Sequence, residues 1–374
     1  MKKLNIVFIN VLITALFLPL ANAALTPSTS KTSVATPTVS APISKPLETS
    51  TPAKVATPIQ TVAPIPTPVV APKPSSTPNT TASVPTVVKP TSPATLPVKV
   101  ILKPSIAIID SGINASIFSN IATQVCALDT PSCSNGQSLM EGPNAADTGY
   151  TTDPVLVHGT EMASIINYVN KSINIIPIRI APITAKGTGG YYTINAIKTA
   201  LDWVVANYAK YNIVAVNVSQ GSVLQICDVP APLIADIDLL KSANVAVIAA
   251  TGNNSNRSAM SAIACLSNVV SVGATDNPAL LGGAAWDSNA APTIGLYSNG
   301  NSATSFYTNG RWFAAIGNQN VEFCVGTSSA TAAFSGWWVL NYKGTYADTY
   351  NWLASSSIPT SNSWLTGRYV KILQ

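Results

Sequence analysis

Five short segments of almost uninterrupted apolar residues restrict the fold of this chain more than any other feature. They lie at residues 105–112, 173–183, 213–219, 245–250 and 268–273. Such runs are typical of strands buried on both faces of a parallel sheet. Residues 192–211 and 234–243 have helical spacing and lie between some of these runs. Alternating strands and helices predict right-handed βαβ units, and therefore an α/β fold whose mostly parallel central sheet is covered by helices on both faces.

The N-terminus has the layout of a secretory signal peptide at residues 1–23. Lys2 and Lys3 precede an apolar stretch, which ends at the small-residue sequence Ala21-Asn22-Ala23. The alternative is an uncleaved anchor, but the short apolar stretch and the small residues favour cleavage. No later stretch is long and apolar enough to cross a membrane. We therefore expect an exported protein, located in the medium, at the cell surface or in the periplasm, with no stable membrane span after cleavage.

Residues 24–103 have a different composition and are predicted to be a disordered linker. They hold 16 of the 28 prolines, one acidic residue and no aromatic residue. Such a segment buries too little apolar surface to offset its chain entropy, so it should be extended and rich in polyproline II structure. An O-glycosylated stalk and a ligand for a proline-recognition module are alternatives to a plain spacer. The folded domain is expected at 104–374.

The positive charge belongs to the N-terminal segments and not to this domain. The chain has a net charge of +5, but nine of its 20 Lys and Arg residues and only one of its 15 Asp and Glu residues precede residue 104. Residues 104–374 therefore carry −3, which gives no support for nucleic-acid binding.

All five cysteines lie in the expected folded domain. Cys126 and Cys133 bracket a short loop and form the most favoured disulfide, and Cys227 and Cys265 could form a second one in an oxidising compartment. Cys324 is left over and is expected to be a buried thiol. No Cys and His spacing typical of a metal site is present, so we predict no metal ligand.

Three residues are candidates for a catalytic site. Asp110 ends the first apolar run, where functional residues of open α/β sheets collect, although an Asp there could also cap a loop. His158, the only histidine, begins an apolar helical run beside Gly159, and it could be a structural residue or a general base. Ser328 begins another apolar helix, where the free amides could stabilise an oxyanion, although a simple helix cap is also possible.

The order Asp110, His158, Ser328 separates three known arrangements of a Ser/His/Asp site. An α/β-hydrolase needs a His after the Ser, and none follows Ser328. The chymotrypsin order is allowed, but its all-β fold conflicts with the helical runs. The remaining order is that of subtilisin. Five segments in this order resemble motifs of the subtilisin-like serine peptidases, the subtilases, over nearly all of the folded part: 108–112, 158–163, 217–221, 249–253 and 326–330.

This resemblance implies a subtilisin-like three-layer fold and a role for each motif. Ser328 would be the nucleophile, His158 the general base, and Asp110 the group that orients the imidazole. Asn253 and the backbone N–H of Ser328 would donate to the oxyanion. Two segments would flank the bound peptide, one of them by strand pairing: Ser219, Gln220 and Gly221, and Ala250, Thr251 and Gly252.

The expected function is that of a monomeric secreted serine endopeptidase that hydrolyses protein or peptide substrates through an acyl-enzyme. The alternative is a catalytically weak binding or surface protein of subtilase fold, carried on the proline-rich spacer. Three positions depart from the family pattern: Glu161 stands in place of a second His, Ser164 in place of a Gly, and Ala332 in place of a Pro. No cofactor is identified. Structural calcium is common in the family, but no compact loop of oxygen ligands can be named.

Overall fold

The computed structural model describes residues 103–221, 227–276, 293–294, 298–362 and 365–372. The predicted signal peptide lies outside the described residues, as does the predicted linker except for Lys103.

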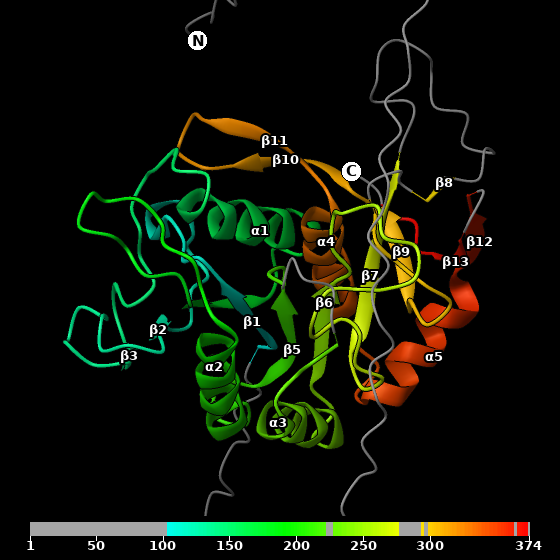
Figure 1. Ribbon diagram of the computed structural model, residues 1–374, viewed down its shortest axis with the longest axis horizontal. Helices are drawn as coiled ribbons and strands as arrows, with labels where there is room; N and C mark the ends of the chain where they lie inside the picture. Colours follow the sequence, from blue (N-terminus) through cyan, green and yellow to red (C-terminus); the bar gives the residue numbers. More distant parts are fainter. Residues whose placement is uncertain (1–102, 222–226, 277–292, 295–297, 363–364, 373–374) are drawn as a thin grey trace, which may run out of the picture. The chain divides into compact units, whose positions relative to one another are not determined.

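One large, mostly parallel sheet forms the centre of the domain (Figure 1). Its strand order over the described residues is β12-β13-β9-β7-β6-β5-β1-β4-β2-β3, with β8 beside β7. All five predicted strands are present and are neighbours in the order β7-β6-β5-β1-β4, with every adjacent pair parallel. Their bounds are β1 Ser105–Asp110, β4 Asn174–Arg179, β5 Ile213–Val218, β6 Ala246–Ala250 and β7 Val270–Asp276.

Successive residues of β1, and likewise of β6, enter two separate cores. Ile106 and Ile108 of β1 pack on the side of α1 and α4, whereas Ala107 and Ile109 pack on the side of α2 and α3. Figure 1 shows α1 beside α4, and α2 beside α3. The four helices are α1 Leu156–Val169, α4 Thr327–Leu340, α2 Ile194–Asn207 and α3 Ala231–Ser242. The prediction of three layers, with a sheet covered on both faces, is therefore confirmed.

The bounds of α2 and α3 differ from those expected, and residues near the start of each helix account for where it begins. Helix α2 begins at Ile194, since the side chain of Thr193 accepts a hydrogen bond from the backbone N–H of Ala196, and it ends at Asn207 instead of residue 211. Helix α3 begins at Ala231, three residues earlier than expected, and Pro232 is its second residue. Proline is well tolerated in a first helical turn because the amides there have no helical partner.

Several short elements were not predicted. The segment 111–155, expected to be irregular, contains β2 and β3, and the region before Ser328 contains four strands of its own. These unpredicted elements are η1 Ala115–Ile117, β2 Val125–Ala127, β3 Leu139–Glu141, β8 Thr293–Ile294, β9 Phe306–Asn309, β10 Arg311–Ala315 and β11 Val321–Val325. Strands β10 and β11 form a separate antiparallel hairpin, which lies next to α1 in Figure 1.

The C-terminal segment, for which the sequence offered no motif, packs against the core. It forms α5 Tyr346–Ser356, β12 Ile358–Ser361 and β13 Thr366–Tyr369. Leu353 of α5 is fully buried in the core on the α1 and α4 side of the sheet. The backbone N–H of Val370 donates to the Tyr307 carbonyl at 2.8 Å, which ties the end of the chain to β9.

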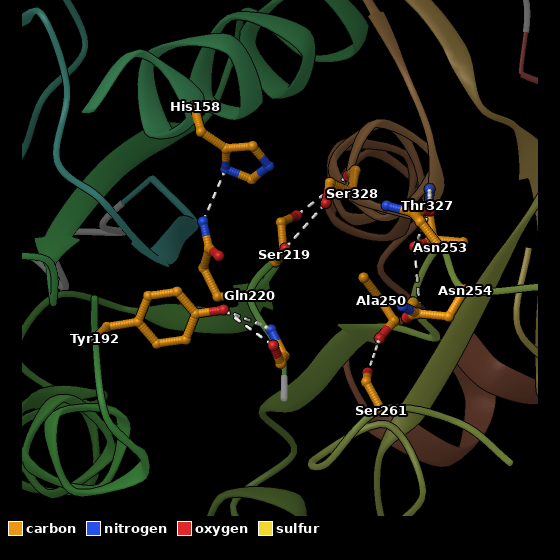
Figure 2. Close-up of a pocket in the computed structure, with 12 residues that line it drawn as sticks. His158, Tyr192, Ser219, Gln220, Ala250, Asn253, Asn254, Ser261, Thr327 and Ser328 are labelled. Carbon is orange, nitrogen blue, oxygen red and sulfur yellow. Dashed lines mark hydrogen bonds between the residues drawn. The ribbon is translucent and has the colours of Figure 1, made fainter. Parts of the chain in front are cut away.

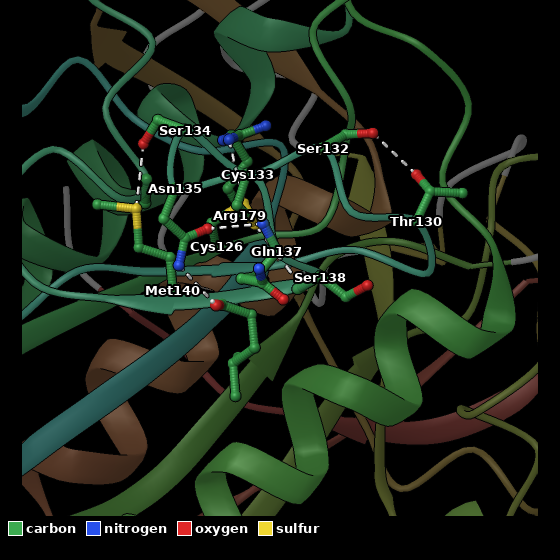
Figure 3. Close-up of a disulfide and its surroundings, with 12 residues drawn as sticks. Cys126, Thr130, Ser132, Cys133, Ser134, Asn135, Gln137, Ser138, Met140 and Arg179 are labelled. Carbon is green, nitrogen blue, oxygen red and sulfur yellow. Dashed lines mark hydrogen bonds between the residues drawn. A yellow bond between two sulfur atoms is a disulfide. The ribbon is translucent and has the colours of Figure 1, made fainter.

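Both expected disulfides are present, and Cys324 is free and buried. Cys126–Cys133 closes the loop between β2 and β3, as Figure 3 shows. Arg179 reaches this bridge from β4 and donates from Nη2 to Cys126 Sγ at 3.1 Å. Cys227–Cys265 joins two segments that are 38 residues apart in the sequence.

Removal of the Cys227–Cys265 bridge is expected to destabilise the domain more than removal of Cys126–Cys133. The two bridges close loops of 38 and 7 residues, for which loop-closure entropy gives about 4 and about 2 kcal/mol. Urea unfolding of the two double Cys→Ala variants would measure the difference, with Cys324→Ala as a control for loss of an unpaired thiol. An equal loss for both bridges would contradict the expectation.

Within the described ranges, no helix is long and apolar enough to cross a membrane. The same ranges contain no group of three or more His, Cys, Asp or Glu side chains arranged to hold a metal ion.

Candidate active site

The carboxyl end of β1 places the Asp110 carboxylate in the protein interior, where it is 1 % exposed. Its Oδ1 accepts a hydrogen bond from the backbone N–H of Ser111 at 2.7 Å and lies 2.8 Å from His158 Nδ1. Its Oδ2 is buried and has no hydrogen-bond partner among the described residues. The carboxylate therefore meets the histidine through a single oxygen, Oδ1, which also accepts a hydrogen bond from Gln220 Nε2 at 2.9 Å.

His158 occupies the first turn of α1, whose start is held in place from both sides. Asp153 Oδ1 accepts hydrogen bonds from the backbone N–H groups of Val155 and Leu156, at 3.1 and 3.0 Å. The next residue, Gly159, packs directly on the loop after β1: a Cβ there would lie 2.0 Å from the Gly112 carbonyl oxygen. Glycine is therefore required beside the histidine, and this close backbone contact brings α1 near enough for His158 to reach Asp110.

The Asp110–His158 contact shifts both pKa values toward the ion pair. Burial opposes ionisation of Asp110, but the positive charge and hydrogen bond of His158, together with hydrogen bonds from Gln220 and the Ser111 backbone, outweigh it, and the pKa of Asp110 falls below 3.8. Burial likewise opposes the imidazolium, but the Asp110 carboxylate holds the pKa of His158 above 6.5. Glu161, one turn further along α1, adds to the rise in the pKa of His158.

This pKa shift predicts a pH dependence for any reaction in which His158 accepts a proton. The neutral imidazole is needed, so kcat/KM should fall as the pH is lowered through the raised pKa of His158, with a midpoint above 6.5. Initial rates between pH 5 and 9 would measure the midpoint, and Glu161→Gln should move it downward because a nearby negative charge is removed. A midpoint below 6.5 in the native protein would contradict the prediction.

Ser328 lies in the first turn of α4 and faces the segment that follows β5. Its Oγ donates to the carbonyl of Ser219 at 3.0 Å, and Ser219 Oγ donates back to the carbonyl of Ser328 at 3.1 Å. Among the described residues, Ser328 Oγ thus uses its hydrogen on Ser219 and not on His158. A rotation of the Ser328 side chain would be needed to bring the hydroxyl to the imidazole.

Asn253 is held beside Ser328 by the start of the same helix. Its Oδ1 accepts from the backbone N–H of Thr327 at 2.9 Å and from Thr327 Oγ1 at 3.0 Å. This leaves Nδ2 as the donor end of the amide. Gly326 has a φ of 142°, and a Cβ there would lie 3.0 Å from Asn253 Nδ2, so a side chain at position 326 would crowd the amide.

These groups border one pocket, with a volume of about 240 Å³ (Figure 2). Eight of the predicted site residues line it: His158, Ser219, Gln220, Gly221, Ala250, Gly252, Asn253 and Ser328. Asp110 lies behind His158. Thr251 is fully buried, and its side chain is not part of the lining.

Sequence reasoning missed four residues that also line the pocket: Tyr192, Asn254, Ser261 and Thr327. The Tyr192 hydroxyl binds Gly221 in both directions, since it donates to the Gly221 carbonyl at 3.0 Å and accepts from its N–H at 3.2 Å. Burial raises the pKa of Tyr192 to about 12, so the hydroxyl stays protonated. Of these four, only Thr327 could have been predicted to line the pocket, because it precedes the predicted nucleophile Ser328 in the sequence.

The loop that carries Asn253 is organised by Asn299, a fully buried residue that sequence reasoning also missed. Asn299 Oδ1 accepts from the backbone N–H groups of Asn254 and Asn256, at 2.9 and 2.8 Å. Its own N–H donates to the Gly252 carbonyl at 2.8 Å. Asn299 thereby fixes the path of the loop on both sides of Asn253.

A family comparison identifies the protein class. Residues 103–352 match the model of the subtilase family, which is two thirds of the chain. The chain belongs to the subtilase family. It is accordingly a serine-type peptidase, a hydrolase. No curated protein sequence shows significant similarity to this subtilase.

Solved structures of similar fold include a cold-adapted subtilisin-like serine proteinase, with 20% sequence identity and a TM-score of 0.53, covering 73% of this chain and 90% of that chain. A mutant of the protease domain of PatA has 18% identity and a TM-score of 0.52, covering 70% and 91%. The prenylagaramide maturation protease PagA has 21% identity and a TM-score of 0.50, covering 69% and 84%. At these identities the similarity shows that this subtilase shares their fold.

The three departures from the usual subtilase pattern have distinct surroundings. Burial raises the pKa of Glu161 to about 7, and the nearby Glu322 carboxyl raises it as well. Ser164 Oγ accepts from the backbone N–H of Ala315 at 2.8 Å, so the residue that replaces a glycine ties α1 to the hairpin. Ala332 is fully buried inside α4, which runs without interruption from Thr327 to Leu340.

Proposed function

We propose that this subtilase is an exported serine endopeptidase that cleaves peptide bonds with Asp110, His158 and Ser328. The observation that carries the proposal is the 2.8 Å contact between Asp110 Oδ1 and His158 Nδ1, at the edge of a pocket that also contains Ser328. A buried carboxylate that binds one imidazole nitrogen leaves the other nitrogen to act as a base toward a serine.

The chemistry follows from these positions. Ser328 Oγ turns from the Ser219 carbonyl and attacks the carbonyl carbon of the substrate while His158 Nε2 takes its proton. Asp110 stabilises the imidazolium through Nδ1. His158 then returns the proton to the leaving amine, which leaves an acyl-enzyme on Ser328. Water, activated by the same imidazole, hydrolyses this ester and restores the serine.

The negative charge of the tetrahedral intermediate would be bound at the start of α4. The N–H of Ser328 belongs to the first helical turn, whose amides have no carbonyl partner within the helix. Asn253 Nδ2 would supply the second donor, because the other end of its amide is bound to Thr327. Donors that are already oriented in this way stabilise the transition state without reorganisation.

The substrate would lie between the two segments that wall the pocket. Ser219, Gln220 and Gly221 continue β5, whereas Ala250 ends β6 and Thr251 and Gly252 follow it, so an extended peptide could pair with either edge. Protein and peptide substrates, and a monomeric enzyme, fit this arrangement. Export is supported by the signal-like sequence at residues 1–23 and by two disulfides, which persist in oxidising compartments.

One observation favours the alternative of a catalytically weak binding protein. Ser328 Oγ donates to the Ser219 carbonyl, so the nucleophile and the base are not joined by a hydrogen bond. If this arrangement persisted with a peptide bound, the pocket would hold the peptide without cleaving it.

A fluorophosphonate probe, which reacts with activated serines, decides between the two functions. Labelling of the native chain at one site that is lost in Ser328→Ala, and strongly reduced in His158→Ala, is the expected result. A folded native chain that stays unlabelled would contradict the peptidase proposal, whereas labelling retained in Ser328→Ala would place the reactive group elsewhere. Ser302→Ala is a matched control outside the pocket lining.

Ser261 forms the floor of the pocket, and its position predicts a preference for a small substrate side chain on the N-terminal side of the cleaved bond. Ser261 lies opposite Ser328 in Figure 2 and is 2 % exposed. Its side chain lies close to both walls: a Cβ on Gly221 would be 2.7 Å from Ser261 Oγ, and one on Gly252 would be 3.6 Å from Ser261 Cβ. Ser261 Oγ also donates to the Ala250 carbonyl at 2.5 Å. The space between the walls is therefore closed by a fixed side chain.

We expect alanine, serine or glycine to be preferred at this substrate position. Ser261→Gly should raise kcat/KM for leucine there by about tenfold or more, in the range expected when space for one or two heavy atoms is gained. Ser261→Ala nearly keeps the volume and removes only the hydroxyl, so it should keep the native preference. Cleavage of a peptide library by the three proteins measures this, and a native preference for large residues would contradict the prediction.

A further inference from the structure

Arg179 is a buried cation that lacks an anionic partner among the residues the structure describes. It is 5 % exposed, and none of the ion pairs in the described part of the chain includes it. Its register neighbour on β1 is Asp110, whose carboxylate is bound to His158 instead. Burial lowers the pKa of the Arg179 guanidinium. A guanidinium nevertheless stays protonated in proteins, so the interior carries an unbalanced positive charge at this point.

The guanidinium of Arg179 points at the Cys126–Cys133 bridge (Figure 3). Nη2 donates to Cys126 Sγ at 3.1 Å, and Nη1 donates to the Ala181 carbonyl at 2.9 Å. Nε is buried and has no hydrogen-bond partner among the described residues. A disulfide sulfur is neutral and only a weak acceptor, so the bridge does not balance the charge. A thiolate at Cys126 would balance it, because its sulfur carries a full negative charge.

The surroundings of the bridge are apolar, which strengthens any interaction between charges there. The residues of this small core are Cys126, Leu128, Cys133, Ala145 and the half-buried Met140. The neighbouring segments contain two carboxylates, and both are bound to other groups. Asp129 accepts a hydrogen bond from Thr193 Oγ1 at 2.8 Å, and Glu141 accepts one from Trp203 Nε1 at 2.9 Å. Arg179 is therefore the charged group that contacts the bridge.

The two sulfurs of the bridge differ in access. Cys126 belongs to β2, inside the sheet, and is fully buried. Cys133 lies in the loop 128–138, and both of its neighbours, Ser132 and Ser134, are exposed. The backbone hydrogen bonds of this loop outside the strands join its residues to each other, so the loop can open locally while the sheet stays intact. An incoming thiol would therefore attack Cys133, and Cys126 would be the leaving sulfur.

We propose that Cys126–Cys133 is a thiol–disulfide exchange site for a low-molecular-weight thiol, in which Arg179 stabilises Cys126 as the leaving thiolate. The thiolate of the reactant attacks Cys133 Sγ, the S–S bond breaks, and its electron pair stays on Cys126 Sγ. The product is a mixed disulfide on Cys133. A second thiolate attacks the reactant's sulfur in this mixed disulfide, which forms the oxidised reactant and releases Cys133. Overall, two thiols are oxidised and the bridge gains two electrons; one proton goes to Cys133 and one to solvent.

The second bridge, Cys227–Cys265, is an internal reference for this inference. Cys227 is exposed, so access alone would make its bridge the first to be reduced. Stabilisation of the Cys126 thiolate predicts the reverse order at equilibrium, because a disulfide whose reduced form is stabilised is the stronger oxidant. The inference is independent of the proposed peptidase activity, since the Cys126–Cys133 bridge lies outside the pocket lining.

Equilibration with glutathione tests the predicted order. The full chain with Ser328→Ala, which prevents self-cleavage, is held in mixtures of reduced and oxidised glutathione, acidified and alkylated, and each cysteine is followed by peptide mass spectrometry. We expect Cys126–Cys133 to be reduced at a glutathione ratio that leaves Cys227–Cys265 intact, with glutathione on Cys133 in the intermediate. Reduction of Cys227–Cys265 first or at the same ratio, or glutathione on Cys126 in place of Cys133, overturns the proposal.

Arg179→Met tests the cause of this order. It removes the charge and keeps an apolar stem, so the equilibrium constant for reduction of Cys126–Cys133 should fall by about tenfold at about pH 8, the effect of one unit in the thiol pKa. Arg179→Lys keeps a positive charge and should lose less. The constant for Cys227–Cys265 should be the same in all three proteins. An unchanged constant in Arg179→Met, or equal losses in the two variants, overturns the proposal.

A measurement on the thiol itself covers the case in which Arg179→Met does not fold. In the Cys133→Ser chain Cys126 is unpaired, and its thiolate is followed by ultraviolet absorbance against pH. Burial raises the pKa of Cys324, so that thiol does not interfere near neutral pH. We expect the midpoint for Cys126 to lie about one unit below the ordinary thiol pKa of about 8.5. A midpoint that is not lowered overturns the proposal, whether or not the chain is a peptidase.

Discussion

Replacing Ser328 by alanine is expected to lower kcat for a peptide substrate by about 10⁶-fold, the size of loss known for removal of the nucleophile in subtilisin. The reason is that no other hydroxyl occupies its position at the start of α4, between the Ser219 carbonyl and the Asn253 amide. Only the oxyanion donors and the substrate walls remain, which should preserve KM to within a few fold. Steady-state assays with a quenched-fluorescence peptide, on protein free of the native chain, measure both constants.

The His158→Ala variant tests whether the two residues act together. Its loss should be similar in size, and the double variant should be no slower than either single one, because each substitution already removes the shared step. Circular dichroism and the urea midpoint control for folding, since Ser328 and His158 each lie in the first turn of a helix. Additive losses, or a Ser328→Ala protein that keeps a tenth of the activity, would refute the assigned roles.

Replacing Asn253 by alanine is expected to lower kcat by about 10²–10³-fold with little change in KM, because the amide is proposed to bind charge that develops only in the transition state. In free energy this is about 3–4 kcal/mol, taken from the corresponding substitution in subtilisin. The same quenched-fluorescence assay measures it.

Asn253 also accepts two hydrogen bonds from Thr327, so loss of structure must be separated from loss of the donor. Asn253→Asp keeps the acceptor for Thr327 and removes Nδ2, whereas Asn253→Ala removes both. If the donor matters, both variants lose kcat by at least 10²-fold, and Asn253→Asp keeps the thermal midpoint more nearly native. An Asn253→Asp protein with native kcat would show that the side chain acts only as a helix cap.

The central strands could be predicted because their signal is local. Each of the five central strands, β7, β6, β5, β1 and β4, is an apolar run. Burial on both faces of the sheet leaves no alternation of polar and apolar residues to misinterpret, as Ile106 to Ile109 show. The short strands β10 and β11 lack this signal. Phe313 and Phe323, which face each other across that hairpin, are 62 % and 45 % exposed, so burial does not explain their spacing.

Residue types and their order in the chain were sufficient to predict which residues form the site. Asp110 and His158 were paired on those grounds, and the structure brings them to 2.8 Å. Their catalytic roles, like that of Ser328, stay predictions until they are tested. Contacts between segments that are distant in the chain could not be predicted from the sequence. Nothing in the sequence near Tyr192 indicates that its hydroxyl binds Gly221, 29 residues away.

Gln220 shows the same limit of prediction from sequence. Its place in the segment after β5 was inferred from a motif, which specifies where the backbone runs. The direction of its side chain depends on the space left beside Asp110 and His158, and that space is set by three separate elements. A motif therefore located the residue, whereas the contacts of its side chain with Asp110 and His158 are known only from the structure.

The Cys227–Cys265 bridge has a consequence for when this enzyme can act. Cys227 lies six residues after Gly221, which lines one wall of the pocket. Cys265 lies four residues after Ser261, which forms the floor of the pocket. The wall and the floor are thus clamped by a bond that the thiol-reducing cytosol does not maintain. A newly made chain inside the cell would have a looser cleft than one that has reached oxidising surroundings. If the chain is exported as we propose, the bridge would form only after the chain has crossed the membrane, and the cleft would become fully constrained at the destination.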